Sequence, residues 1–212
     1  GPYCHGFGWG QGDIGGRPAA ALVARDSNPG AVHSSLGGVG RNIAHNMALL
    51  GLDVRLLTAF GDDLNAQKVA ASCGELGIDI SQSPIISGGR TSTYLFISDE
   101  HGDMALAVSD MEIYQHLTPQ ALAQRHKLLD TSQLVIIDTN IPEESIVWLA
   151  ENCAAPLFAD PVSTAKAPKL KPVLGYLHTL KPNRLEAELL SGVPITDSES
   201  LNRAADALLE TG

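Results

Sequence analysis

The order of apolar and polar positions along the chain predicts that short strands and helices follow one another. Apolar runs of strand length end at glycine or polar residues, whereas longer segments carry apolar residues at helical spacing. Strands are predicted at residues 54–60, 134–138, 157–160 and 178–180. Helices are predicted at residues 43–50, 65–76, 118–129, 142–153, 184–190 and 198–211, the last with Ser198 as its N-cap. This alternation favours a mostly parallel sheet with helices on both faces.

Two segments depart from this alternation of strands and helices. Residues 91–98 and 104–108 are strand-like and flank residues 99–103 (DEHGD), which is a hairpin signal. The stretches 14–36 and 90–110 therefore predict antiparallel strands set apart from the main sheet. We expect one α/β domain over residues 13–212 that carries a small β appendage.

The first twelve residues (GPYCHGFGWGQG) are rich in glycine and show neither strand nor helix periodicity. The sequence predicts neither a strand nor a helix for them.

Composition narrows the class of protein. The net charge is −10, and no run of Lys or Arg provides the positive patch that nucleic-acid binding needs. Three cysteines lie far apart without metal-ligand spacing, which favours a reduced, cytoplasmic setting. No apolar run is long enough to cross a bilayer. We expect a protein of the cytoplasm that binds a small molecule and neither nucleic acid nor membrane.

A glycine cluster at residues 37–44 (GGVGRNIA) opens the first predicted helix. Glycines let the backbone approach a ligand closely, and a helix N-terminus offers N–H groups without intrahelical acceptors. The cluster is not a Walker A loop, because no Gly-Lys-Ser/Thr follows. A Rossmann oxidoreductase would need an apolar strand directly before the cluster, but residues 28–36 are polar and contain Pro29.

The continuation of this cluster carries a family resemblance. Residues 37–63 (GGVGRNIAHNMALLGLDVRLLTAFGDD) resemble the N-terminal signature of ribokinase-like (PfkB) kinases, and residues 180–192 (LKPNRLEAELLSG) resemble the N-x-x-E element of that family. The resemblance runs from about Asp13 to the end of the chain. Shorter likenesses to pseudouridine kinases in particular lie at residues 26–30 (DSNPG), 109–111 (SDM), 138–140 (DTN), 160–163 (DPVS) and 178–188 (HTLKPNRLEAE).

The resemblance implies a ribokinase-like three-layer fold whose two β segments form a lid over the sugar and pair with the lid of a second subunit in a homodimer. Asp13 matches the acidic residue that holds sugar hydroxyls, although Gln11 stands where the family has Asn and no strand is evident before it. The substrate-binding residues that it implies, or that lie at the matching strand ends, are Asp13, Gly37, Gly38, Asn42, Thr93, Asp110 and Asn140.

Asn183 and Glu186 are candidates for the phosphate side of the site. They lie three residues apart at a predicted strand-to-helix junction. A carboxylate and an amide suit a hydrated magnesium ion, which keeps most of its waters. We therefore expect Asn183 to serve ATP and Glu186 to serve Mg²⁺. The competing interpretation is that Asn183 caps the helix and Glu186 is solvated.

The G-A-G-D element of the family, whose aspartate deprotonates the acceptor hydroxyl, does not occur in the sequence. No catalytic residue is therefore assigned, and we expect this chain to bind poorly and to catalyse nothing measurable. As a C-terminally truncated fold with an exposed sheet edge, it is expected to aggregate or to rely on a complementing fragment.

The resemblance implies ATP-dependent phosphorylation of the 5′-hydroxyl of a ribosyl substrate. Pseudouridine is the favoured substrate, and ribose, adenosine or another nucleoside are the alternatives. A sugar- or nucleoside-binding remnant without transfer chemistry, or a regulatory partner, is the competing function.

Overall fold

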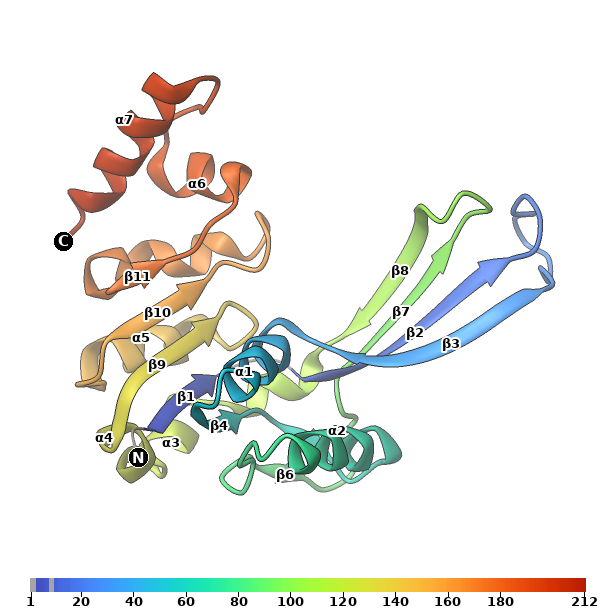
Figure 1. Ribbon diagram of the computed structural model, residues 1–212, viewed down its shortest axis with the longest axis horizontal. Helices are drawn as coiled ribbons and strands as arrows, with labels where there is room; N and C mark the ends of the chain where they lie inside the picture. The colour runs from blue at the N-terminus through green and yellow to red at the C-terminus, as the bar shows by residue number, and fades with distance from the viewer. Residues whose placement is uncertain (1–2, 8–9) are drawn as a thin grey trace.

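The computed structural model describes residues 3–7 and 10–212, and its main element is a five-stranded parallel sheet with the strand order β11-β10-β9-β1-β4. Figure 1 shows this sheet beside a second, elongated one. The strands of the main sheet are β1 (Tyr3–Phe7), β4 (Asp53–Leu57), β9 (Ser132–Asp138), β10 (Leu157–Asp160) and β11 (Thr179–Leu180). A further pair, β5 (Phe60–Gly61) and β6 (Ile85–Ile86), forms a separate parallel ladder.

β1 overturns the expectation that the first twelve residues contain no strand. Tyr3–Phe7 lies inside the sheet, paired in parallel with β4 on one side and with β9 on the other. The partner strands on both sides satisfy the backbone of this segment, so a weak local pattern does not prevent strand formation. Residues 1–2 and 8–9, which the sequence also left unassigned, lie outside the described residues.

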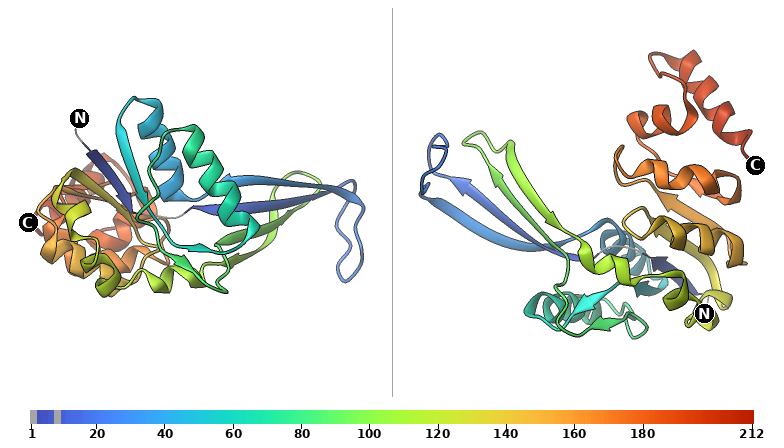
Figure 2. Two further views of the ribbon diagram at one scale, coloured as in Figure 1. Left: turned by 90° about the horizontal axis from the view of Figure 1, so that it is seen from below. Right: turned by 180° about the vertical axis from the view of Figure 1, so that it is seen from behind.

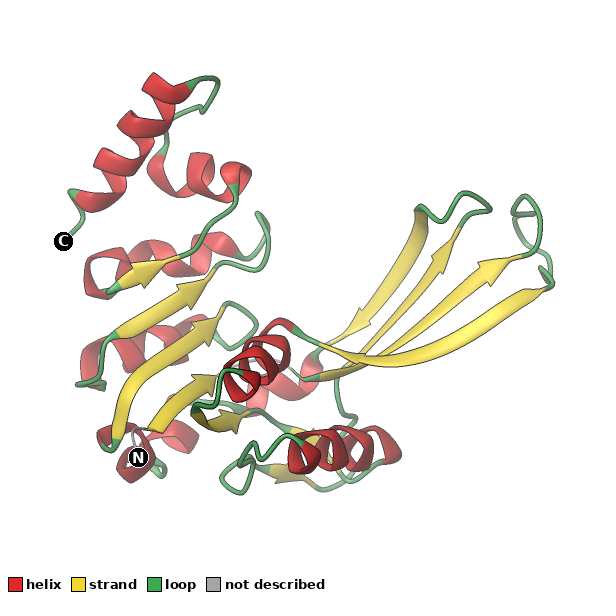
Figure 3. Ribbon diagram, viewed as in Figure 1, coloured by secondary structure: helices red, strands yellow, loops and turns green. Residues whose placement is uncertain are grey.

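Helices cover both faces of the sheet, as the alternating pattern predicts (Figure 3). They are α1 (Val39–Leu49), α2 (Leu64–Glu75), α3 (Pro119–Ala123), α4 (His126–Asp130), α5 (Glu143–Asn152), α6 (Arg184–Ser191) and α7 (Ser198–Leu209), with the 3₁₀ helices η1 (Glu112–His116) and η2 (Ala167–Tyr176).

Two buried hydrophobic clusters lie on opposite faces of the main sheet, so the fold has three layers: helices, sheet and helices. One joins α1, α2 and β4, and the other joins α3, α5 and η2 to β9 and β10. Alternate residues of β9 serve the two clusters: Val135 is buried in the second, whereas Leu134 packs against the first.

Three local expectations need correction. The helix predicted at 118–129 is divided, because Arg125 has non-helical dihedral angles and its Nη1 donates to the Ala121 carbonyl at 2.7 Å. η2 was not predicted, since its prolines hide the helical spacing. The N-cap of α7 is Asp197 rather than Ser198, because the Asp197 carboxylate accepts from the Ser200 amide in a reciprocal capping box.

The second sheet is the expected lid, a four-stranded sheet with the order β3-β2-β7-β8. Its strands are β2 (Gln11–Pro18), β3 (Gly30–Gly37), β7 (Thr93–Ser98) and β8 (Met104–Asp110). It projects away from the main sheet in every view (Figures 1 and 2). Its two hairpin pairings are antiparallel as predicted, but β2 and β7 pair in parallel, which joins the two segments into one sheet.

The register divides the lid into two unlike faces, because directly paired residues share a face and neighbours along a strand alternate. Asp13 is paired with Ser35 and Tyr94, so these three side chains lie on one face. The opposite face carries Gly12 and Thr93, and at its base it packs on α2, where Asn65 donates to Thr93. That face also carries the apolar residues Ile14, Val32, Leu95, Ile97, Leu106 and Val108.

Among the described residues, no helix is long and apolar enough to span a membrane.

Candidate functional site

The strand order of the main sheet marks where a ligand is expected. From β1 the chain first adds β4 on one side and later β9 on the other, so the strand order reverses between β1 and β9. Open α/β sheets bind ligands at such a switch point, outside the carboxyl ends of the strands. Asp13 follows β1 and Asn140 follows β9. The Tyr114 hydroxyl, which is buried, donates to the Gly10 carbonyl at 3.0 Å and ties the segment after β1 to η1.

Asp13 is the acidic group at this point. Gln11 Nε2 donates to its carboxylate, so the unusual residue two positions earlier orients the aspartate directly. Burial raises the pKa of Asp13, while the Gln11 hydrogen bond and the charge of Arg41 act in the opposite direction. A half-buried carboxylate that is held by a neutral amide can accept hydrogen bonds from ligand hydroxyls.

Gly37 allows the Asp13 carboxylate to take that position. A Cβ built on Gly37 would lie 2.2 Å from Asp13 Oδ2, so only glycine leaves room for the carboxylate as it stands. Gly38 follows with φ of 98°, a conformation that glycine favours, and becomes the N-cap of α1. Asn42 lies in the first turn of α1, exposed, and accepts from Arg41 Nη1 at 3.3 Å. The glycine cluster therefore places the start of α1 next to Asp13.

Asn140 lies in a turn fastened by buried groups. Its amide N–H donates to Asp138 Oδ1 at 2.9 Å, and Asp138 has no exposed surface. Lys166 Nζ donates to the side-chain oxygen of Asn140, and Lys169 Nζ donates to the carbonyls of Thr139 at 2.8 Å and of the residue after Asn140 at 3.1 Å. Burial lowers the pKa of both lysines, and the Asp138 carboxylate opposes that effect.

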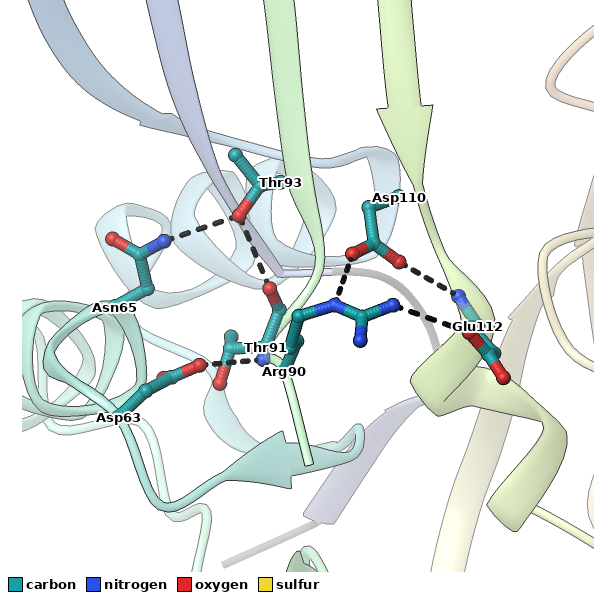
Figure 4. A network of polar contacts seen from close by, with 7 residues as sticks. All are labelled: Asp63, Asn65, Arg90, Thr91, Thr93, Asp110 and Glu112. Atoms are coloured by element: carbon teal, nitrogen blue, oxygen red, sulfur yellow. Dashed lines mark hydrogen bonds and ion pairs between the residues drawn. The ribbon is translucent and has the colours of Figure 1, made fainter. Parts of the chain in front are cut away.

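Thr93 and Asp110 do not join these residues. They are paired with each other on the lid face opposite Asp13. The Thr93 hydroxyl donates to the Thr91 carbonyl and accepts from Asn65, both at 3.1 Å, and Arg90 Nε donates to Asp110 at 2.8 Å (Figure 4). The hydrogen bond from Arg90 lowers the pKa of Asp110. Both residues thus have internal partners that fasten the base of the lid.

Asn183 and Glu186 form a reciprocal cap on α6. The Asn183 side chain accepts from the Glu186 amide at 2.9 Å, and Glu186 Oε1 accepts from the Asn183 amide at 3.0 Å. Capping by Asn183 is thereby confirmed, whereas a solvated Glu186 is wrong, because only 3% of it is exposed. Glu186 Oε2 is buried without a hydrogen-bond partner, which fits a carboxylate that can still hold a magnesium-bound water.

No group of three or more His, Cys, Asp or Glu side chains lies together as a metal-binding cluster would among residues 10–212, whose side chains the structure describes. A magnesium ion needs no such cluster where one or two carboxylates and substrate phosphates hold it.

Three residues of the site escaped the sequence analysis. Tyr94 lies on the face of Asp13, but its orientation depends on the pairing of β2 with β7. Lys166 and Lys169 lie in a segment where the sequence predicts no helix or strand. Only their position shortly after residues 160–163 (DPVS) could have drawn attention to them.

A parallel sheet from whose switch-point edge a separate β lid projects, with an aspartate beside a helix that begins at a glycine cluster, defines a ribokinase-like α/β protein. Ribokinase from Arabidopsis thaliana, solved with ribose and ATP, superimposes with a TM-score of 0.88 at 16% identity, over all of this chain and 69% of that one. A putative sugar kinase from Clostridium perfringens superimposes with a TM-score of 0.87 at 34% identity, over all of this chain and 67% of that one.

The chain belongs to the pfkB family of carbohydrate kinases, whose model matches residues 19–212. It is 40% identical to pseudouridine kinase of Escherichia coli over 194 residues, which are 91% of this chain and 62% of that protein. It is also 40% identical to the uncharacterized sugar kinase YeiI of the same organism, over 94% of this chain and 56% of that protein. The chain thus spans less than two thirds of both curated relatives.

Proposed function

We propose that this chain is the sugar-binding part of a kinase that transfers a phosphoryl group from ATP to the 5′-hydroxyl of a ribosyl substrate, with pseudouridine as the favoured substrate and pseudouridine 5′-phosphate as the product. The observation that carries the proposal is the position of Asp13 at the switch point, held by Gln11 and accommodated by Gly37. Pseudouridine is favoured because a 40% identical relative is a pseudouridine kinase.

Residues from three parts of the fold would bind the sugar. The Asp13 carboxylate would accept hydrogen bonds from two ribose hydroxyls, which is a geometry that a carboxylate provides with its two oxygens. Gly38 lets the backbone approach the sugar, and Asn42 would add an amide that can both donate and accept. Asn140 would contact the substrate from the carboxyl end of β9. Thr93 and Asp110, which lie on the other lid face, are not part of this proposed site.

The nucleotide side would lie near the start of α6. Asn183 would face the ATP phosphates, and Glu186, whose Oε2 has no protein partner, would hold a magnesium-bound water. Magnesium at such a position would neutralise charge on the transferring phosphate. The residues present therefore fit the expected ion.

A second copy of the chain would cover the lid face opposite Asp13, and the protein would act as a homodimer in the cytoplasm. Apolar side chains on that face support a dimer, because Val32, Leu106 and Val108 are 79%, 57% and 60% exposed. Contiguous exposed apolar side chains of this kind are typical of protein–protein contacts. Light scattering on the purified chain tests this part of the proposal, and a monomer at micromolar concentration would contradict it.

The competing function is a nucleoside-binding protein or regulatory partner without transfer chemistry. Turnover separates the two functions. Phosphorylation of pseudouridine by this chain would exclude the binding-only function, and saturable binding without product would favour it and confirm the expected inactivity.

The test of the sugar site is calorimetric titration of the chain with pseudouridine, uridine and ribose, in the presence of magnesium and an ATP analogue. We expect saturable binding that Asn42→Ala weakens by about tenfold, which is the loss of one good hydrogen bond. Asn46→Ala is the matched control, because Asn46 is exposed one turn later on the same helix. Failure of a folded chain to bind any of these ligands would refute the sugar site.

A further inference from the structure

A cluster at the carboxyl ends of β9 and β10 joins Asn140, which also belongs to the proposed sugar site, to two residues that neither the sugar site nor the phosphate site uses. Lys166 precedes η2, and its Nζ contacts the side-chain oxygen of Asn140 and, at 3.1 Å, the sulfur of Met111, which follows β8. Three chain segments thus converge on one ammonium group: the ends of β9 and β10 and the exit from the lid.

Asn140 carries a second sign of a ligand. Asn140 is only 8% exposed. Its side-chain oxygen accepts from Lys166, whereas its Nδ2 is buried and has no acceptor. A buried amide donor without an acceptor costs free energy, so its presence in a fold indicates that another group completes its hydrogen bonds. Lys169 holds the backbone on both sides of Asn140, so the amide stays in place.

The register of the lid gives the span between this cluster and the sugar site. Asp13 of β2 is paired with Tyr94 of β7, which is paired with Ser109 of β8, two residues before Met111. Two strand spacings of about 4.8 Å and the rise of about 3.3 Å for each of the two residues after Ser109 put Met111 roughly 12 Å from Asp13. A ribose held at Asp13 would reach the cluster with a one-ring substituent on C1′ but not with the sugar alone.

We propose that Lys166, Asn140 and Met111 form a subsite that binds a carbonyl-bearing pyrimidine ring attached to C1′ of the ribosyl substrate. This inference rests on the proposed function and adds residues that select a nucleoside over the free sugar. Lys166 Nζ and the Asn140 amide donate to ring carbonyl oxygens, and the Met111 thioether packs against the ring.

The surroundings favour a neutral ring over a phosphate in this subsite. The buried Asp138 carboxylate offsets part of the positive charge of Lys166 and Lys169, and Met111 contributes an apolar surface. A phosphate would meet that carboxylate in a poorly solvated place, whereas a carbonyl oxygen accepts from an ammonium without bringing a net charge.

The experiment compares ligands on the wild-type chain and then repeats the comparison on one variant. The ligands are pseudouridine, ribose and the phenyl C-riboside, which carries a ring of similar size without carbonyl groups. We expect pseudouridine to bind at least tenfold more tightly than the phenyl C-riboside, and Lys166→Met to remove that difference while ribose affinity stays within twofold. Lys171→Met is the control, because Lys171 is exposed on η2.

Each outcome has one meaning. Equal affinity of the wild type for all three ligands refutes the ring subsite and leaves the sugar site standing. An equal loss of ribose and pseudouridine affinity in Lys166→Met also refutes it, since Lys166 would then support the sugar or the fold. No binding of any ligand refutes the proposed function itself. If Lys166→Met fails to fold, as thermal unfolding would show, the wild-type comparison between pseudouridine and the phenyl C-riboside still decides.

Discussion

Replacing Gly37 by alanine separates the binding role of Asp13 from the stability of the fold. The new Cβ would lie 2.2 Å from Asp13 Oδ2 and 2.9 Å from its Cγ, where ordinary contacts begin at 3.4 Å. The Asp13 carboxylate must therefore retreat by about 1 Å, whereas the backbone at Gly37 does not have the positive φ that would strain an alanine.

The expected magnitudes differ for binding and for stability. The retreat disturbs the hydrogen bond from Gln11, worth about 0.5–1.5 kcal/mol, while alanine gains about 0.4–1 kcal/mol by restricting the unfolded chain. These two contributions nearly cancel, so we expect the free energy of unfolding to change by less than about 1 kcal/mol. A hydrogen bond to a charged group contributes about 1.5–3 kcal/mol, so ribosyl ligands that lose one should bind about 10- to 100-fold more weakly.

The assay is calorimetric titration with pseudouridine and ribose, together with denaturant unfolding of the same samples. Gly74→Ala is the matched control: a Cβ there meets no atom within 4 Å, and the position lies in α2. It should leave binding unchanged and stabilise the protein by about 0.5–1 kcal/mol. Wild-type affinity in folded Gly37→Ala would show that the Asp13 carboxylate does not hold the ligand.

Three further predictions follow from single groups. Ligand hydroxyls donate to ionised Asp13, whose pKa burial raises, so affinity should begin to fall at a pH above the ordinary aspartate value of 3.8; titrations at decreasing pH measure this. Because folding raises that pKa, ionised Asp13 opposes folding at neutral pH, and Asp13→Asn should keep or gain stability while losing ligand. Tyr114→Phe leaves the buried Gly10 carbonyl without its donor and should cost about 1–3 kcal/mol in denaturant unfolding. Asn183→Ala removes the acceptor that caps α6 and should cost about 1 kcal/mol, whereas Asn183→Ser should restore most of it.

Each of these predictions has its own contrary result. Affinity that stays constant down to pH 3.8 would mean that Asp13 ionisation is irrelevant to binding. Unchanged stability of Tyr114→Phe, with the less buried Tyr94→Phe as its control, would show that the Gly10 carbonyl finds another donor. Equal stability of the two Asn183 variants would exclude the cap as the source of any loss.

The sequence alone was sufficient for the elements whose information is local. Glycine spacing and apolar periodicity located α1, α2 and the hairpin of β7 and β8, because each depends on residues a few positions apart. The run at residues 37–63 indicated the family for the same reason. The likeness at residues 180–192 located the Asn183–Glu186 pair, but the burial of Glu186 depends on the packing of α6 and was not predicted.

Only the tertiary structure decided which of the candidate residues meet. β1 has a weak local pattern and exists because β4 and β9 pair with it on both sides. The parallel register of β2 and β7 turns Thr93 and Asp110 away from Asp13 and turns Tyr94 toward it, and a shift of one residue would reverse all three. Lys166 reaches Asn140 across 26 positions of sequence. Pairing and register between distant segments are set by the burial of whole faces, so no local spacing in the sequence records them.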